Sequence, residues 1–431
     1  MTPLFSLASL IKPGARQTLG QLEGSGLALA VAELVAGHDH PVVLLVADTP
    51  SALRLEQEVQ FLLRNQPKPR PVLLFPDWET LPYDSFSPHQ DIISQRLETL
   101  YHLPRMQHGL LIIPVATLML RTPPQSFIDR FSLLVKPGDK LDLHGLRRRL
   151  EQAGYNAVEQ VLEHGEFAAR GSLLDLFPMG SKEPYRIDFF DDEVDTIRAF
   201  DPDSQRSSEP VNAVRLLPAH EFPTDKEAIE LFRQRYRERF EISRAPECVY
   251  QQVSKGLWPA GIEYYLPLFF EHSSTLLDYL PTESLLLTLG DIHGAGQQFW
   301  QDVERRYEDR RYDLNRPLLP PPTLYQPVDE LFAALKGYSQ FTLQPLPAEE
   351  KAGRYNLSIH RLPELTVDAQ RSDPLNLLRD FLGNYQGRVL FCTESEGRRE
   401  SLRELLAPLD LRLAEFSSLD DFLTAKPRCG I

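Results

Sequence analysis

Cysteine and long apolar runs are both scarce in this sequence. The three cysteines, Cys248, Cys392 and Cys429, lie too far apart along the chain for a zinc site or a disulfide framework, which suits a reducing compartment. No stretch approaches the roughly 20 apolar residues that a membrane-spanning helix needs. The apolar run at residues 4–11 also lacks the preceding positive charges of a signal peptide. We therefore expect a cytoplasmic protein with no metal ion and no membrane contact.

Positive charge is scarce relative to negative charge. The 46 lysines and arginines face 61 aspartates and glutamates, which gives a net charge of −15 at pH 7. Because an acidic protein repels a polyanion, any contact with nucleic acid must be local. The length of 431 residues leaves room for about three domains.

The first 130 residues alternate between helix and strand patterns. This alternation predicts an α/β fold with a parallel sheet and right-handed crossovers. We expect helices at residues 27–35, 51–63 and 91–103, and strands at residues 41–47, 72–75 and 109–115.

Residues 131–218 interrupt this pattern. Short strand patterns separated by glycine, proline and aspartate turns follow a predicted helix at residues 143–152, which indicates an inserted α+β domain. An apolar strand at Leu285–Leu289 should rejoin the first sheet, so that residues 219–345 complete the first lobe. The proline-rich stretch Arg316–Pro327 should form a surface loop.

Residues 346–370 are typical of a linker with room for one strand. A further α/β pattern occupies residues 371–431 but remains incomplete. Because a fragment of this size has little to pack against, we expect the chain to be the front part of a longer protein. Helices are expected at residues 375–382 and 397–406, and strands at residues 388–392 and 411–416.

The stretch at residues 185–200 predicts a β-hairpin with an arginine and an aromatic side chain on its outer face. Alternate residues of a strand point to opposite faces, so Ile187 and Phe189 should face the core while Arg186 and Phe190 face outward. Arginine and large aromatic residues dominate the energy of protein interfaces, and truncating one can cost about 2 kcal/mol or more. With no nucleophile, metal cluster or acid–base pair nearby, the pattern indicates a binding surface.

A purely structural role also accounts for these residues. Phe190 could close the end of the core, and Arg186 could pair with Asp188 or Asp192. The hairpin turn is expected at residues 191–192 and a register slip at residues 194–197.

Residues 21–28 precede a predicted helix, in the position of a Walker A phosphate loop. Gly24, Ser25 and Gly26 keep the shape of such a loop, but the groups that bind phosphate and magnesium are missing. The replacements are Gln21 for the first glycine, Leu27 for the lysine and Ala28 for the serine or threonine.

The acidic pair that a nucleotide hydrolase needs is also incomplete. The strand Leu285–Leu289 is followed by Asp291 alone. The sequence therefore predicts a degenerate loop without ATP hydrolysis, although a Gly-Ser-Gly turn by itself is also common in loops.

Five separate motifs resemble one family. Together they resemble the N-terminal, UvrB-like part of the bacterial transcription-repair coupling factors (Mfd), over nearly the whole chain. They are Asp77-Trp78-Glu79-Thr80-Leu81-Pro82-Tyr83 with its continuation to residue 90, the block at residues 165–201, Leu217-Pro218-Ala219-His220-Glu221-Phe222-Pro223, Gly261-Ile262-Glu263-Tyr264-Tyr265, and residues 394–400.

The resemblance implies a degenerate helicase-like lobe in two segments, interrupted by a domain that binds UvrA. It assigns UvrA contacts to Arg170, Arg186 and Phe190, while Ala168 stands where UvrB has the first arginine of a Phe-Arg-x-Arg pair. UvrB carries a long hairpin after its counterpart of Tyr83. That hairpin is missing here, so damage verification is not expected.

The resemblance also limits what this chain should do alone. In the family, ATP, magnesium, RNA polymerase and DNA are bound by parts of the full-length protein outside these residues. We therefore expect a monomeric, non-enzymatic adaptor for UvrA in transcription-coupled nucleotide excision repair, with no cofactor. The alternatives are a divergent nucleotide-dependent domain that binds damaged DNA, and direct DNA binding through the arginines at 147–149 and 233–239.

Overall fold

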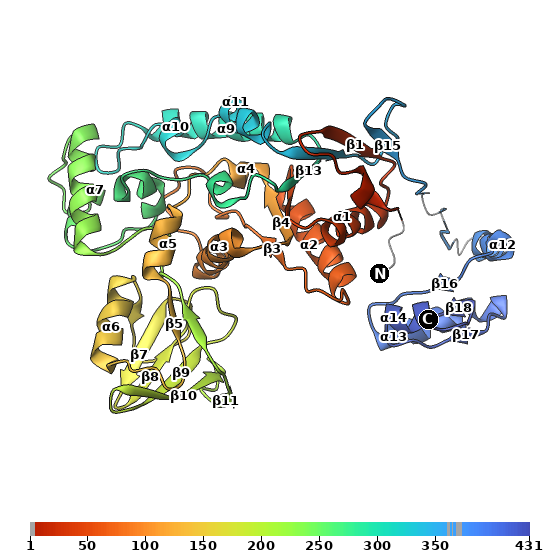
Figure 1. Cartoon of the computed structure of the whole chain (residues 1–431), viewed down its shortest axis with the longest axis horizontal. Coiled ribbons are helices and arrows are strands. Elements are labelled where there is room, and N and C mark those ends of the chain that lie inside the picture. The colour runs from red at the N-terminus through yellow and green to blue at the C-terminus, as the bar shows by residue number, and fades with distance from the viewer. Residues whose placement is uncertain (1–4, 360–362, 364, 368–372) are drawn as a thin grey trace. The chain divides into compact units, whose positions relative to one another are not determined.

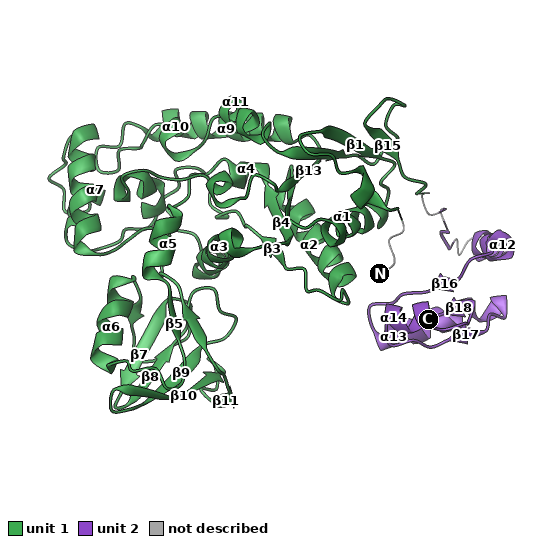
Figure 2. Cartoon of the chain, viewed as in Figure 1, with its two compact units in different colours: residues 1–359 green, residues 360–431 purple. Residues whose placement is uncertain are grey.

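The computed structural model describes residues 5–359, 363, 365–367 and 373–431. The chain folds as two compact units, residues 1–359 and 360–431, which are coloured separately in Figure 2. Within the described residues, no helix is both long enough and apolar enough to cross a membrane.

A seven-stranded parallel sheet forms the centre of the first unit (Figure 1). Its strand order is β15-β1-β14-β13-β2-β4-β3, so strands from both ends of the unit lie side by side. The strands are β1 (Arg16–Gly20), β2 (Pro41–Val46), β3 (Val72–Leu74), β4 (Gly109–Pro114), β13 (Leu285–Leu289), β14 (Ser339–Leu343) and β15 (Arg354–Asn356).

Helices surround this sheet. The α-helices are α1 (Gly26–Gly37), α2 (Thr49–Leu63), α3 (Gln90–His102), α4 (Val115–Leu118), α5 (Gln125–Phe131), α7 (Lys226–Arg239), α8 (Val249–Ser254), α9 (Ile292–Arg310), α10 (Pro321–Leu324) and α11 (Val328–Leu335). Short 3₁₀ helices are η1 (Leu7–Leu10), η2 (Leu103–Arg105), η3 (Ile262–Phe269) and η4 (Leu276–Tyr279).

Alternate residues of the central strands enter two different cores. In β2, Val42 and Leu44 pack with α1 and α2, whereas Val43 and Leu45 pack with α3, α4 and α9 on the other face. A parallel sheet covered on both faces favours continuous apolar strands, which is why β2 and β4 have no polar side chain and β13 has only Thr288.

The structure confirms the expectation for the strand at residues 285–289 and corrects the one for the stretch at residues 316–327. The strand Leu285–Leu289 does rejoin the first sheet, where it lies between β2 and β14. The stretch Arg316–Pro327 is not a surface loop: Leu319, Leu324 and Tyr325 are buried, and α10 forms within it. Prolines held against a core can brace buried chain as well as exposed chain, so the composition alone was misleading.

The inserted region leaves and re-enters the lobe through an antiparallel pair, β5 (Leu133–Val135) with β12 (Val214–Leu216). Beyond it lies a six-stranded sheet of order β11-β10-β9-β8-β7-β6. Helix α6 (Leu143–Gln152) is capped by the side chain of Asp142 and buries Leu146 and Leu150. The strands are β6 (Asn156–Ala157), β7 (Glu166–Arg170), β8 (Leu173–Leu176), β9 (Tyr185–Phe190), β10 (Glu193–Phe200) and β11 (Ser207–Pro210).

Three of the five family-like motifs meet in one buried polar junction. Glu221 accepts hydrogen bonds from Trp78 Nε1 at 2.8 Å and from Arg96 Nε at 2.8 Å. Nearby, Ser87 Oγ donates to Glu263 at 2.8 Å and accepts from the Gly261 amide at 2.9 Å. The motifs therefore hold the inserted region's exit against both segments of the lobe.

The second unit is a small three-stranded parallel sheet of order β16-β18-β17 with flanking helices. Its helices and strands are α12 (Asn376–Asn384), β16 (Val389–Leu390), α13 (Glu396–Leu406), η5 (Ala407–Leu409), β17 (Leu413–Ala414), α14 (Leu419–Thr424) and β18 (Cys429–Gly430).

Candidate functional site

The strand register of the inserted domain places Arg170, Arg186 and Phe190 on one face of its sheet. Arg170 lies opposite Leu173, which lies opposite Asp188 on the next strand, β9. Arg186 and Phe190 flank Asp188 at a spacing of two residues, so these five positions share a face. Ile187 and Phe189 are buried on the other face, as the alternation predicts.

Arg186 is fixed in place by a buried aspartate from the neighbouring strand. Its Nε and Nη2 donate to the two carboxylate oxygens of Asp175 at 2.7 and 2.9 Å. Its guanidinium also lies over the ring of Phe200, 5.1 Å from the centroid. Hydrogen bonding to Asp175 raises the pKa of Arg186, and the charge-assisted fork fixes its direction. The structural alternative, in which Arg186 pairs with Asp188 or Asp192, is therefore wrong in its choice of partner, which is Asp175.

Phe190 projects from the sheet into solvent. Its side chain is 76% exposed at the end of β9. The turn is formed by residues 191–192, as expected, and Asp191 has a φ of 55°, which aspartate tolerates better than most residues. The register also slips between Val194 and Thr196. A large exposed ring on a rigid hairpin does not close the core, so the structural alternative for Phe190 is wrong.

Ala168 lies on the same sheet face but is buried. It packs in a small cluster with Val161, Phe177 and Phe200. Arg170, at the end of β7, is exposed and donates from Nη2 to the carbonyl of Glu159. Ala168, which stands where the resemblance places an arginine of UvrB, therefore makes apolar contacts instead.

The loop at residues 21–28 is covered by a later segment of the same chain, residues 344–359. Gln21 and Gly24 adopt positive φ angles of 62° and 54°, and α1 begins at Gly26. The backbone N–H groups of Gln21 and Leu22 donate to the carbonyls of Leu346 and Gln344 at 3.0 and 3.2 Å. Residues 344–359 thus lie along the loop.

The covering reaches the first turn of α1. The Gln21 side-chain amide donates to the carbonyl of Ile359 at 3.0 Å, and a methyl group added at Gly26 would collide with the Ile359 side chain. Leu27 and Ala28 are buried in the core rather than directed toward the loop. Ser25 makes no side-chain cap hydrogen bond to α1. Asp291, the single acid after β13, caps α9 by accepting from the Gly294 amide at 2.9 Å.

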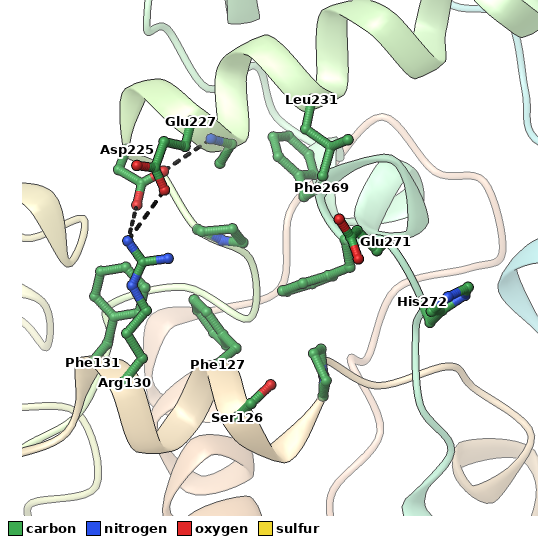
Figure 3. Close-up of a pocket in the computed structure, with 14 residues that line it drawn as sticks. Ser126, Phe127, Arg130, Phe131, Asp225, Glu227, Leu231, Phe269, Glu271 and His272 are labelled. Atoms are coloured by element: carbon green, nitrogen blue, oxygen red, sulfur yellow. Dashed lines mark hydrogen bonds and ion pairs between the residues drawn. The ribbon is translucent and has the colours of Figure 1, made fainter.

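A separate cavity of about 560 Å³ lies between α5, α7 and the chain after η3 (Figure 3). Phe127, Phe131 and Leu231 are among its lining residues. At its rim Arg130 reaches both Asp225 and Glu227, at 3.4 Å each. One arginine thus faces two carboxylates at this rim.

Two residues on the sheet face were not singled out from the sequence. Asp175 is only 5% exposed within the otherwise apolar Leu-Leu-Asp-Leu of β8, and Arg198 lies directly opposite Arg186 on β10. For Asp175, the sequence offers one signal of a functional or structural role: a charged residue stands inside an otherwise apolar strand. For Arg198, the signal is its position next to Ile197, because alternation along the strand then directs Arg198 outward.

This geometry defines a class of protein: an α/β lobe that carries an antiparallel interaction domain with an arginine and aromatic face. Residues 133–222 match the UvrB interaction domain, and residues 381–431 match the MFD D3 domain. The chain is 52% identical over 412 residues to the transcription-repair-coupling factor of Escherichia coli K12, covering 95% of this chain and 36% of that protein.

Transcription-repair-coupling factors from other bacteria are also similar to this chain. The transcription-repair-coupling factor of Haemophilus influenzae is 46% identical over 416 residues, covering 96% of this chain and 36% of the relative. That of Bacillus subtilis is 28% identical over 302 residues, covering 66% and 25% respectively. The chain belongs to the transcription-repair-coupling factor family and spans about a third of the length of the relatives to which it is most similar among these.

Proposed function

We propose that this chain is the UvrA-recruiting adaptor region of a transcription-coupled repair factor. The observation that carries the proposal is the exposed Phe190 beside the fixed Arg186 on the sheet of a UvrB interaction domain. An exposed aromatic side chain and arginines on one sheet face have the composition of an interface hot spot. Contacts with RNA polymerase and DNA belong, in this proposal, to other parts of the full-length family protein.

The test is the affinity of the purified chain for UvrA. We expect Arg170→Ala, Arg186→Ala and Phe190→Ala each to weaken binding by about tenfold or more, as loss of a hot-spot residue does. The melting temperature should change little for Arg170→Ala and Phe190→Ala, because both side chains are exposed. Full affinity in all three variants would contradict the proposal.

We also propose that the lobe neither binds nor hydrolyses ATP. The loop has Leu27 in place of the lysine and Ala28 in place of the serine or threonine, and Ile359 with residues 344–346 covers it from its own chain. A nucleotide would have to displace these contacts without the charge-assisted bonds that normally hold its phosphates. Equilibrium titration with ATP and magnesium should show no saturable binding at millimolar nucleotide. Saturable binding would instead favour the nucleotide-dependent alternative.

A further inference from the structure

The outer face of the inserted sheet contains an arginine pair of which the family resemblance assigns only one member, Arg186. Arg186 on β9 and Arg198 on β10 are direct cross-strand partners. Like charges directly opposite each other destabilise a sheet, so the fold itself gains nothing from this arrangement. The two arginines therefore need separate explanations.

Their surroundings differ sharply. Asp175 neutralises Arg186 through both carboxylate oxygens, and Ser207 Oγ accepts a further bond from its Nη1 at 3.2 Å. Arg198 is exposed, and among the described residues its guanidinium makes no hydrogen bond or ion pair. Its neighbour on the edge strand β11 is Pro210, which offers no charge. The uncompensated charge of this pair is thus on Arg198.

Apart from Asp175, the acidic residues on this face lie at its other end. Glu193 is the cross-strand partner of Phe190, and Asp188 lies between Phe190 and Arg186 on β9. The face is therefore polarised along the strands. The ring of Phe190 lies beside the two acids, whereas the unpaired cation, Arg198, lies on β10, opposite a point about two strand positions beyond Asp188. Such a pattern orients a partner as well as attracting it.

We propose that Arg198 is a specificity-determining residue of the UvrA-binding face and that it pairs with a carboxylate on UvrA. In this arrangement Asp175 is a positioning residue, because it holds the guanidinium of Arg186 near the ring of Phe200 and leaves Arg198 as the free donor. The inference rests on the function proposed above. It adds a fourth contact residue and states the charge of the group that it meets.

The experiment compares Arg198→Ala, Arg198→Glu and Arg198→Lys in the full 431-residue chain, by affinity for UvrA at several salt concentrations. We expect about a tenfold loss for Ala and a larger loss for Glu. Lys, which keeps the charge, should lose about threefold or less. The salt dependence of the affinity should be shallower for Arg198→Ala than for the parent, because a charge pair has been removed. A residue with a merely structural role would not change that slope.

Arg148→Glu is the matched control. Arg148 is exposed on α6, which covers the opposite, core-facing side of the same sheet, so this variant changes the net charge equally without touching the face. It should bind UvrA as the parent does. Parental affinity and salt dependence in Arg198→Ala and Arg198→Glu would overturn the inference while leaving the adaptor function in place. Absence of UvrA binding by the parent chain would overturn both.

Discussion

At the scale of single residues, the buried junction between the motifs contains an unusual carboxylate. Glu263 is 6% exposed, and its burial raises its pKa from 4.5 to about 7. The nearby charge of Glu221 raises the pKa further, whereas the hydrogen bond from Ser87 Oγ lowers it. The folded state thus keeps Glu263 protonated at pH values where the unfolded chain has released the proton.

This shift predicts a pH-dependent effect of Glu263→Gln. Between pH 4.5 and about 7 the folded state binds more protons at this site than the unfolded state, so the contribution of Glu263 to stability falls as pH rises. Glutamine is isosteric and neutral at every pH. Relative to the parent, the variant should be nearly unchanged at pH 4.5 and more stable at pH 8, by at most about 3 kcal/mol.

Urea denaturation of parent and variant at several pH values measures this difference. Glu247→Gln is a suitable control because Glu247 is exposed, and its effect should stay small and nearly independent of pH. If the difference between Glu263→Gln and the parent did not grow between pH 5 and pH 8, the assigned protonation of Glu263 would be wrong.

At the scale of elements, the strongly apolar strands could be predicted from the sequence, as could helices such as α6, whereas the polar strands could not. Strand β13 is five residues long and almost wholly buried, and α6 was predicted with its observed bounds. Strands β1 and β14 were not predicted because their polar residues, such as Gln17 and Thr342, occupy a sheet created by distant segments. Tertiary context sets such strands more than local propensity does.

The sequence pattern also does not predict helix α9, because few of its residues are apolar and buried. It has 19 residues, but only Ile292, Gly296 and Val303 are buried, so its apolar stripe is weak. The site shows the same division. Local alternation placed Arg186 and Phe190 on the outer face, whereas the pairing of Arg186 with Asp175 depends on which strand lies beside β9.

The covering of the loop by β15 and its flank gives an element-scale prediction for Gly26→Ala. Three side-chain carbons of Ile359 lie within contact range of the added methyl group, so rotating one methyl group cannot relieve the collision. We expect the amide of Leu357, which donates to the Gly20 carbonyl at 3.1 Å, to exchange its hydrogen at least about tenfold faster.

The double variant Gly26→Ala with Ile359→Ala separates this collision from other effects. Removing the Ile359 side chain makes room for the methyl group, so exchange of the Leu357 amide, which directly follows β15, should return to within about twofold of Ile359→Ala alone. Unchanged exchange in Gly26→Ala would show that Ile359 does not hold β15 against the loop.

At the scale of the whole molecule, each unit has its own core. The first unit contains two large buried clusters on the two sides of its sheet, and the second contains a small cluster around Leu378, Leu382 and Leu406. The stretch expected to be a linker contributes β15 to the first unit, where it pairs with β1. Part of that stretch, residues 360–362, 364 and 368–370, lies outside the described residues.

This organisation predicts that two truncations of the chain differ in stability. A chain of residues 1–359 keeps β15, whereas a chain of residues 1–345 loses it. The shorter chain also loses the contacts of buried Ala348 with Asn356, whose side chain bonds both backbone groups of Ala348 at 2.6 and 2.9 Å. Strand β1 would become the edge of the sheet, and the covering of the loop by Ile359 would disappear.

We expect the 1–359 chain to unfold at the same urea concentration as the first unit of the parent. The 1–345 chain should be less stable by about 2–4 kcal/mol, since it loses a strand, two buried apolar side chains and several backbone hydrogen bonds. Both should bind UvrA equally, because the sheet face lies within the inserted domain and shares no residue with β15. Equal stability of the two truncations would mean that β15 is dispensable, and that the loop at residues 21–28 needs no partner from its own chain.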